Sequence, residues 1–544
     1  MVGGVFMSLS TKLARMLVGV AAVAVIVGSA SAAPAPDARS AERIKAHVTF
    51  LADDLLQGRE AGSPGFDIAA AYVASQLAQL GVKPGAAGGS YFQPVPMKGF
   101  RAADQGKLVL SHDGKATALV FGEDYVPGRD PRANATHVSA PMVFVGYGVV
   151  ADGLDAYAGL DVKGKVVVAL SGAPASLQTE ERAYYASGRT KRQAAEARGA
   201  VGFITVNTPA DQARRPFEGS VRNWQNWGMT WRDASGKPHT PGGSTPDLGT
   251  VSVEGAAKLF AGAPSSFAEV VKAVEAGGAK GFVLPSTIDV TLNTETKDVE
   301  SANVVGVIEG SDPKLKNDVI VLSAHLDHVG VTAPVKGDSI NNGALDNASG
   351  VATTLEVARA FAEGKPPRRT LIFLLNTAEE KGLIGSDYFA RNPTTTRPIV
   401  ANVNLDMPVL TYDFTDVVAF GAERSTLGPA VRRAAARQGV TLSADPMPQE
   451  GLFTRSDHFR FVEQGVPSVF LMTGFANGGE EAFTSFLKEH YHKPSDDLTQ
   501  PINYAAGAKL AAINYEITRE LADADKTPSW NKGDFFGTLF AKKP

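Results

Sequence analysis

The 544-residue chain contains no cysteine. Disulfide bonds, thiolate metal ligands and a cysteine nucleophile are therefore excluded, as is lipidation at a mature N-terminal cysteine. Any metal site has to be built from histidine, aspartate and glutamate. Ligands of that kind are typical of open catalytic sites rather than of closed, cysteine-rich structural sites.

The chain also lacks long runs of one charge. Charged residues make up 20% of it, and the formal net charge is -4. Proteins that bind nucleic acid or an anionic membrane surface normally carry a basic patch, so we expect no nucleic-acid partner. A G-x-S-x-G motif is missing as well, which argues against the serine mechanism of α/β-hydrolases.

The N-terminus has the layout of a secretory signal peptide. Lys12 and Arg15 precede the apolar run Met16 to Val27, and the small residues Ala-Ser-Ala follow at 30–32. The run is shorter than the roughly 18 to 20 residues that cross a bilayer. We therefore expect cleavage near position 32, export to the periplasm or the medium, and no stable membrane anchoring afterwards.

Two later segments differ in their hydrophobic pattern. From about 141 to 281, short apolar runs such as PMVFVGYGVV, GKVVVAL and AVGFITVN are separated by Gly, Asp and Pro, which predicts an independent β-containing unit. From 303 onwards, nearly continuous apolar strands alternate with amphipathic helices. That alternation predicts a layered α/β domain with a largely parallel sheet that is buried on both faces.

Polar clusters stand at the expected carboxyl ends of the strands in this second segment. They are SAHLDHVG, GALDNASG, NTAEEKGLIGS and NVNLDM, and a fifth, EHYHKPSDD, follows the last strand. Ligands of such sheets bind at this edge. Converging carboxylates repel one another unless cations are present, and no cluster of Arg or Lys stands beside them. Two divalent metal ions are the simplest explanation, and His with carboxylates suits zinc, manganese or cobalt.

In this order, HLDH, GALDNASGVA, EEKGLIGS, NLDM and YHKPSDD resemble the motifs of the co-catalytic dizinc exopeptidases of the bacterial leucyl aminopeptidase type, which are relatives of glutamate carboxypeptidase and the transferrin receptor. The resemblance implies an α/β fold: a three-layer, phosphorylase/hydrolase-like zinc-peptidase domain with a mixed, largely parallel sheet. VFVGYGVV and RTKRQAAEARGAVGFITV resemble a protease-associated domain, usually a lid or a substrate-shaping module, inserted into it.

These features predict the domain organisation. We expect a signal peptide at 1–32, the N-terminal part of the catalytic domain at 33–135, an inserted β-rich protease-associated domain at 136–285, the main part of the catalytic domain at 286–525, and a C-terminal tail at 526–544.

The resemblance also implies a set of metal ligands. It implies that one ion is held by His325 and Asp406 and the other by Glu380 and His492. Asp346 is implied as the carboxylate that bridges the two ions, for which zinc is the expected metal.

Further roles follow from the same resemblance. Glu379 is implied as the general base that takes a proton from the attacking water and delivers it to the leaving amine. Tyr491 resembles the tyrosine that donates a hydrogen bond to the tetrahedral intermediate in some members. Asp327 resembles the carboxylate that orients the imidazole of His325 and fixes its tautomer.

Three histidines near the motifs leave alternatives open. His328 and His490 are spare imidazoles next to the site, and the YH-x-P spacing favours His492 over His490 as the ligand. In RSDHFRF, Asp457 and His458 favour a helix start with a packed histidine over a wall of the pocket.

The implied activity is that of an exported zinc aminopeptidase that removes N-terminal residues from peptides. A carboxypeptidase or a glutaminyl cyclase on the same scaffold is the alternative. A carboxypeptidase of the glutamate type needs Arg or Lys for a C-terminal carboxylate, and the catalytic loops contain Arg455 and Lys493 but no dense cluster. A non-catalytic relative is expected to lack the ligands, all of which are present. The oligomeric state stays open.

Overall fold

The computed structural model describes residue 1 and residues 38–277 and 280–541. The expected signal peptide therefore lies outside the described residues, apart from its first residue. Among the helices of the described part, none combines the length and the apolar character that crossing a bilayer requires.

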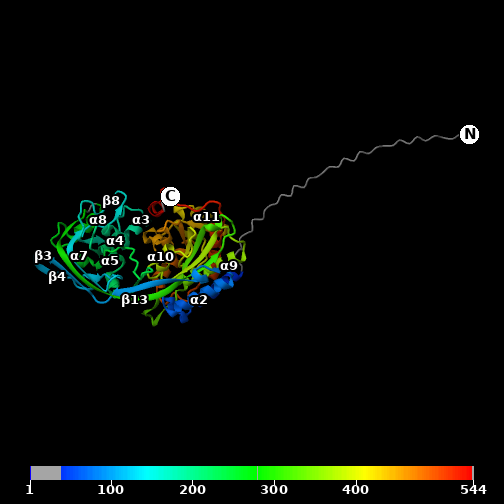
Figure 1. Cartoon of the computed structure of the whole chain (residues 1–544), viewed down its shortest axis with the longest axis horizontal. Coiled ribbons are helices and arrows are strands. Elements are labelled where there is room, and N and C mark those ends of the chain that lie inside the picture. The colour runs from blue at the N-terminus through cyan, green and yellow to red at the C-terminus, as the bar shows by residue number, and fades with distance from the viewer. Residues whose placement is uncertain (2–37, 278–279, 542–544) are drawn as a thin grey trace.

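One strand, β13 (Phe282–Ile308), passes through both sheets of the molecule (Figure 1). Its first half pairs with β3 (Lys107–His112) and β6 (Ala135–Phe144) in what we call the second sheet. Its second half pairs with β2 (Phe92–Ala102) and β17 (Thr370–Asn376) in the first sheet. The two sheets are thus covalently and geometrically continuous along a single strand.

The first sheet has a parallel centre. Its order is β2, β13, β17, β14, β18, β21, β19, β20, in which the four strands from β17 to β21 are parallel and β13 and β19 flank them antiparallel. The remaining strands of this sheet are β14 (Val319–His325), β18 (Ile399–Leu405), β21 (Ser468–Thr473), β19 (Asp416–Phe420), β20 (Thr441–Ser443), β1 (Lys83–Pro84) and β11 (Gly228–Trp231). The carboxyl ends of β14, β17 and β18 consequently meet at one edge.

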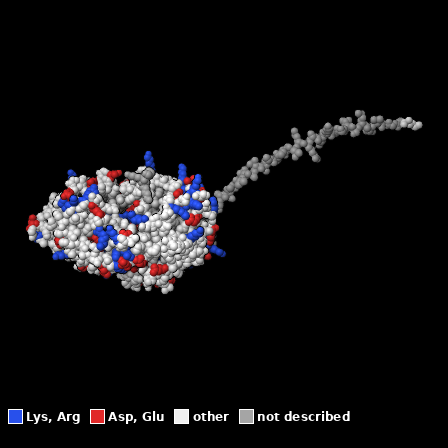
Figure 2. Space-filling model, viewed as in Figure 1, with Lys and Arg blue, Asp and Glu red and all other residues white. Residues whose placement is uncertain are grey.

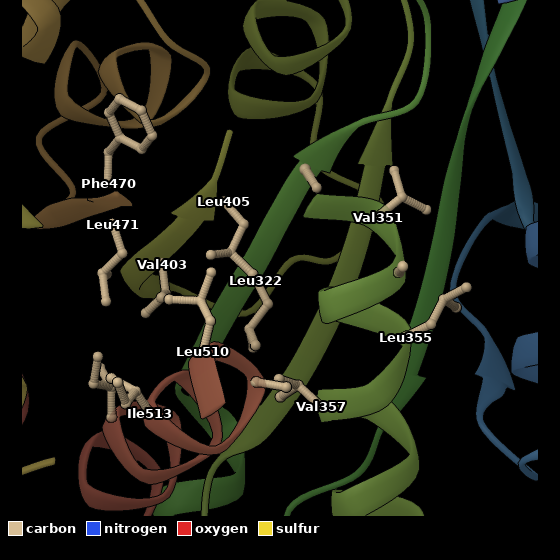
Figure 3. Close-up of a cluster of buried hydrophobic side chains, with 14 of the residues drawn as sticks. Leu322, Val351, Leu355, Val357, Val403, Leu405, Phe470, Leu471, Leu510 and Ile513 are labelled. Carbon is tan, nitrogen blue, oxygen red and sulfur yellow. The ribbon is translucent and has the colours of Figure 1, made fainter. Parts of the chain in front are cut away.

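Helices cover both faces of the first sheet. Ile320 and Leu322 on β14 pack into the large core that also holds side chains of α9 and α14, as Figure 3 shows for Leu322. Val319 and Val321, which point the other way, pack with side chains of α10 and α12. The helices of this unit are α1 (Ala38–Leu51), α2 (Pro64–Gln79), α9 (Ser349–Glu363), α10 (Ile384–Arg391), α11 (Leu427–Arg437), α12 (His458–Val462), α13 (Gly479–Glu489), α14 (Tyr504–Asp523) and α15 (Phe535–Phe540). The predicted three-layer α/β fold with a mixed, largely parallel sheet is confirmed.

The second sheet belongs to a separate unit, residues 103–293 apart from β11, with hydrophobic cores of its own. Its order is β4, β3, β13, β6, β9, β10, β12, β5, with β6 to β12 parallel. Further elements of this unit are β4 (Lys115–Ala118), β5 (Tyr125–Pro127), β7 (Val150–Ala151), β8 (Leu154–Asp155), β9 (Val166–Leu170), β10 (Gly202–Val206), β12 (Asp247–Val251), α3 (Thr179–Ala186), α4 (Gly188–Glu196), α5 (Pro209–Arg214), α6 (Phe217–Arg222), α7 (Val253–Leu259) and α8 (Phe267–Glu275).

The second unit begins earlier than the sequence predicts. The strands β3, β4 and β5 lie before position 136, yet they pair within the second sheet. The predicted boundary at 285 falls inside β13, where the register with β6 shifts between Val283 and Thr287 but the strand continues. A strand's hydrophobic pattern shows that it is a strand but not which partner it pairs with, so the two sheets could not be separated from the pattern.

The three neighbouring tryptophans of the second unit pack against different elements. Trp231 is buried on β11, the strand that the segment 103–293 contributes to the first sheet, and it donates from Nε1 to Asp387 Oδ2 on α10 at 2.6 Å. Trp224 packs on Phe121, and Trp227 lies under a lysine ammonium. Local packing therefore accounts for all three. On the face shown in Figure 2, acidic and basic side chains are interspersed, so long-range steering by this face would be weak.

Candidate metal centre

The predicted site residues lie at the carboxyl edge of the first sheet. His325 is the last residue of β14, Asp406 directly follows β18, and Glu379 and Glu380 follow β17 by three and four residues. Parallel neighbours end at the same edge, which is why motifs far apart in the sequence meet here.

His325, Asp346 and Asp406 form the first group of possible ligands. Nε2 of His325 lies 3.0 Å from Asp406 Oδ1 and 3.2 Å from Asp346 Oδ1, and all three residues are buried. Asp346 comes from the turn before α9, and its peptide bond to Asn347 is cis.

Glu380 is the centre of the second group. Its Oε2 lies 3.0 Å from His492 Nε2, and its Oε1 lies 2.8 Å from His328 Nδ1. Asp346 Oδ2 lies 3.5 Å from His492 Nε2, so the two oxygens of Asp346 face the two groups. Asp346 thus lies between the two groups of possible ligands.

The histidine alternatives separate clearly in space. His490 turns away from the site, since its Nδ1 lies 3.0 Å from Ser495 Oγ. His328 is fully buried and approaches Glu380 as closely as His492 does, while its Nε2 has no hydrogen-bond partner among the described residues. Both His492 and His328 are therefore within reach of a second ion, and His490 is not.

The donor set fits two divalent cations. Three groups of described residues offer ligand atoms within 4.8 Å of one another, namely His325 with Asp346 and Asp406, His325 with Glu379 and Glu380, and His328 with Asp346 and Glu380. The separations of 3.0 and 3.2 Å around His325 Nε2 are close to those of atoms that share one ion at bonds of about 2.0 to 2.2 Å. Imidazole with carboxylate and no thiolate is the ligand chemistry of zinc, manganese or cobalt.

Asp327 holds the paired glutamates through their backbone. Its Oδ1 accepts the N–H of Glu379 at 3.0 Å, and its Oδ2 accepts the N–H of Glu380 at 3.3 Å. The sequence analysis expects this carboxylate on the imidazole of His325. In the structure, the main-chain oxygen of Asp327 lies 3.1 Å from His325 Nδ1 instead, because the carboxylate turns toward the neighbouring loop.

Burial and neighbouring charges shift the pKa values of these groups strongly. Burial, together with the negative charge of Asp406 and Glu380, raises the pKa of Glu379 well above its ordinary value. Burial acts the same way on Glu380, but hydrogen bonds from His328 and His492 outweigh it and lower the pKa of Glu380 to about 2. The pKa values of these two adjacent carboxyl groups are thus shifted in opposite directions.

The imidazoles respond to the same carboxylates. Burial opposes a positive charge on His325, but Asp406 and Glu379 raise its pKa well above 6.5. For His492, hydrogen bonds to Asp346 and Glu380 overcome burial and raise the pKa to about 10. The carboxylates therefore create a strongly negative electrostatic potential at the site, which favours the binding of protons or metal ions.

Arg59 is a buried cation beneath the site that the sequence analysis missed. Its guanidinium donates to the main-chain oxygens of Leu326 at 2.9 Å, Asn342 at 2.6 Å and Gly343 at 3.2 Å, and also to Leu51. The loops that carry the two ligand motifs are thereby tied to the N-terminal segment. The preceding Gly58 lets the chain approach this loop closely, since a side chain there would meet Asn341 O at 2.4 Å.

A second missed residue, Ser456, supports Asp406. Its Oγ donates to Asp406 Oδ2 at 2.6 Å and accepts from Asn404 Nδ2 at 2.8 Å. The adjacent Asp457 accepts from an asparagine on β17, and His458 begins α12 fully buried against Phe453. The structure thus places a packed histidine at the helix start, as the sequence favours.

A cavity of about 210 Å³ opens beside the ligand groups. Asp346, Glu379, Asp406 and Tyr491 line it near the site. Apolar side chains line much of the remaining wall: Met407, Met447, Leu452, Phe470, Met472, Phe483 and Leu487. Such a cavity accepts a mostly apolar group next to the reactive end of a ligand.

Comparison with known proteins places this site within a family-specific segment. Residues 303–518 match the profile of peptidase family M28, and this segment, less than half of the chain, contains every ligand candidate described above. A "probable leucine aminopeptidase 2" of Aspergillus oryzae is 28% identical over 287 residues, which are 48% of this chain and 52% of that protein. A "probable zinc metalloprotease" of Pyricularia oryzae is 26% identical over 291 residues, 46% of this chain and 56% of that protein.

The solved structure of an aminopeptidase from Aneurinibacillus sp. strain AM-1 has a similar fold. It aligns with a TM-score of 0.51 at 22% identity and covers 90% of this chain and 95% of that one. The chain spans about half the length of the curated relatives it matches.

Proposed function

We propose that this protein is a zinc-dependent aminopeptidase that hydrolyses the N-terminal residue of peptides. The observation that carries the proposal is the position of Asp346, whose two oxygens face His325 on one side and His492 on the other. A carboxylate between two such groups is what a pair of metal ions requires. The match of this segment to peptidase family M28 supports the same reading.

The residues that would hold the ions divide into two sets around Asp346. His325 and Asp406 would hold one ion, and Glu380 with His492 the other, with His328 as a further imidazole within reach. When bound, such ions polarise the scissile carbonyl and lower the pKa of a bound water.

Glu379 is the general base in this proposal. It lines the cavity next to the ligand groups, a position from which it can accept a proton from the attacking water and pass it to the leaving amine. Asp327 fixes the backbone from which this carboxylate projects.

Tyr491 would hydrogen-bond the oxyanion of the tetrahedral intermediate. It lines the same cavity, and its ring stacks on the ring of His492 at a centroid distance of 3.8 Å. Burial raises its pKa, so the hydroxyl stays protonated and acts as a donor.

We propose further that the protein is exported and that the second unit is an inserted protease-associated domain. The signal-like layout before position 32 supports export. The insertion of a complete second sheet between β2 and the far half of β13 supports the domain assignment.

The proposal is tested with a panel of aminoacyl nitroanilides and of peptides blocked at either end, each assayed with and without a chelator. We expect cleavage that needs a free amino end, vanishes with chelator and returns with added Zn²⁺. Cleavage of N-terminally blocked peptides from a free carboxyl end would instead favour a carboxypeptidase. Activity that survives chelation would contradict the metal mechanism.

A further inference from the structure

The cavity beside the catalytic groups includes a cation contributed by the second unit. Arg215 directly follows α5, and its side chain lines the cavity together with Glu450 and Arg455 from the loop before α12. A residue more than 100 positions away from the nearest catalytic motif therefore reaches the reaction chamber.

The two arginines differ in their partners. Arg455 lies 3.6 Å from the carboxylate of Glu450, so its charge is partly balanced inside the cavity wall. The guanidinium of Arg215 makes no hydrogen bond or ion pair with any residue that the structure describes, and the residue is exposed. Its charge is therefore available to a ligand.

The backbone of Arg215 is held in place by a short capped helix. Thr208 and Asp211 form a reciprocal capping box at the start of α5, and the N–H of Arg215 donates to the main-chain oxygen of Asp211 at 2.7 Å. The buried Phe217 anchors the chain two residues later. The guanidinium thus extends from a fixed base rather than from a long free loop.

The balance of charges in the cavity indicates that Arg215 can bind a negatively charged group of a ligand. Under the proposed function, two divalent ions offset the four carboxylates of Asp346, Glu379, Glu380 and Asp406. Arg215 is then the cavity cation whose charge is not balanced. A guanidinium binds a carboxylate through two parallel hydrogen bonds, which makes carboxylate the matching ligand chemistry.

We infer that Arg215 recognises a carboxylate of the substrate and is a specificity-determining residue of this enzyme. This inference rests on the proposed function. The cavity, about 210 Å³, is smaller than the roughly 300 to 1,000 Å³ of typical ligand pockets, so the recognised group belongs to the residues beside the cleaved bond. It is either the C-terminal carboxylate of a dipeptide or the side chain of an N-terminal acidic residue.

The test compares paired substrates on the metal-loaded full chain. One arm uses Leu-Ala and Leu-Ala-amide, and the other uses the nitroanilides of glutamate and glutamine. We expect one arm to favour the carboxylate substrate in kcat/KM by about 10-fold or more, the size of one charged hydrogen-bonded pair. Arg215→Gln should abolish that preference and leave the rate on the uncharged substrate within a factor of about two.

Arg214→Gln is the matched control. Arg214 is the preceding residue, lies 3.6 Å from Asp211, and does not belong to the described lining of the cavity. It should keep the wild-type preference. If Arg215→Gln retains the preference as fully as Arg214→Gln does, or if the wild type shows no preference in either arm, the inference is wrong.

Calorimetric titration with a reduced-amide analogue of Leu-Ala separates this inference from the proposed function. The analogue keeps the carboxylate but cannot be cleaved, and its carboxamide is the uncharged probe. Weaker binding of the carboxylate analogue to Arg215→Gln than to Arg214→Gln supports the inference even if no substrate is hydrolysed. Equal binding to both variants overturns it, whatever the activity of the wild type.

Discussion

At the scale of single residues, two adjacent glutamates have different surroundings. Glu380 is held between His328 and His492, whereas the carboxylate of Glu379 accepts no hydrogen bond from a side chain that the structure describes and lines the cavity. We predict that Glu379→Gln keeps its metal content while turnover falls by roughly 10² to 10⁴. Metal analysis and kcat measured on the same preparation check this.

The control for that prediction is Glu380→Gln, which should lose metal itself because it removes a ligand charge. Equal metal loss in both variants, or full activity of Glu379→Gln, would mean that the roles of the two glutamates are assigned wrongly.

Arg59 leads to a prediction about stability. Its buried guanidinium satisfies main-chain oxygens on three separate segments, so Arg59→Met leaves these acceptors unpaired. We expect a loss of at least about 3 kcal/mol in the free energy of unfolding, measured by urea denaturation. Arg39→Met, at an exposed position on α1, should change it by less than about 0.5 kcal/mol. A small effect of Arg59→Met would show that the loops keep their arrangement without it.

The site residues illustrate what could be predicted from the sequence. Ligand candidates such as His325 and Asp406 follow apolar strands, so the hydrophobic pattern already places them at one edge of the sheet. Arg59 has no such signal. Its partners are main-chain oxygens, and Leu326 lies 267 residues further along the chain. A backbone acceptor can belong to any residue type, so the sequence does not encode this contact as a motif.

At the scale of elements, the turn after β17 depends on one carboxylate. Asp327 accepts two backbone N–H groups, from Glu379 and Glu380, and asparagine offers only one oxygen for them. We predict that Asp327→Asn lowers metal affinity by about 10- to 100-fold, measured by competition with a chelator. Asp338→Asn, at an exposed position on β16 (Asp338–Asn341), should leave metal affinity unchanged. Wild-type affinity in Asp327→Asn would show that the turn holds its position by other contacts.

The end of β9 gives a prediction about pH. Lys191 is buried and donates from Nζ to the main-chain oxygens of Leu170, at 2.7 Å, and Gly172, and burial lowers its pKa from 10.5 to about 7. Between these values the unfolded chain binds more protons than the folded one, so this residue makes the free energy of unfolding rise with pH from about 7 to about 10.5.

Lys191→Met tests this prediction by urea unfolding at several pH values. The increase between neutral and alkaline pH should be smaller in Lys191→Met than in the wild type, and Lys163→Met, at an exposed position, should follow the wild type. If the free energy of unfolding has the same pH dependence in all three proteins, the pKa of Lys191 is not lowered by burial and the prediction is wrong.

Element types and sheet membership differ in how far they could be predicted. The apolar runs that form β14 and β17 are recognisable as strands from the sequence. Their alternation with helices predicts a parallel sheet. The path of β13 through both sheets could not be predicted, because strand pairing depends on contacts between distant segments. The early strand β3 joins the second sheet for the same reason.

At the scale of the whole molecule, the second unit is fastened to the first by specific polar contacts. Arg189 on α4 lies 2.8 Å from the carboxylate of Glu463, which follows α12, and Trp231 on β11 donates to Asp387 on α10. Because Arg215 reaches the cavity from the second unit, the proposed recognition of substrate carboxylates depends on the placement of that unit.

Trp231→Phe tests this fastening. The substitution leaves a smaller aromatic ring to stack on His239 and removes the indole N–H, so Asp387 Oδ2 loses the donor that lies 2.6 Å away. Because Asp387 is buried, we expect a loss of about 1 to 3 kcal/mol in the free energy of unfolding, measured by urea denaturation. We also expect a weaker preference for carboxylate substrates, since the base of Arg215 shifts with the second unit. Trp227→Phe, the control, keeps an aromatic ring under Lys297 and should change the free energy of unfolding and the substrate preference little. Equal effects of the two substitutions would mean that the indole hydrogen bond of Trp231 does not position the second unit.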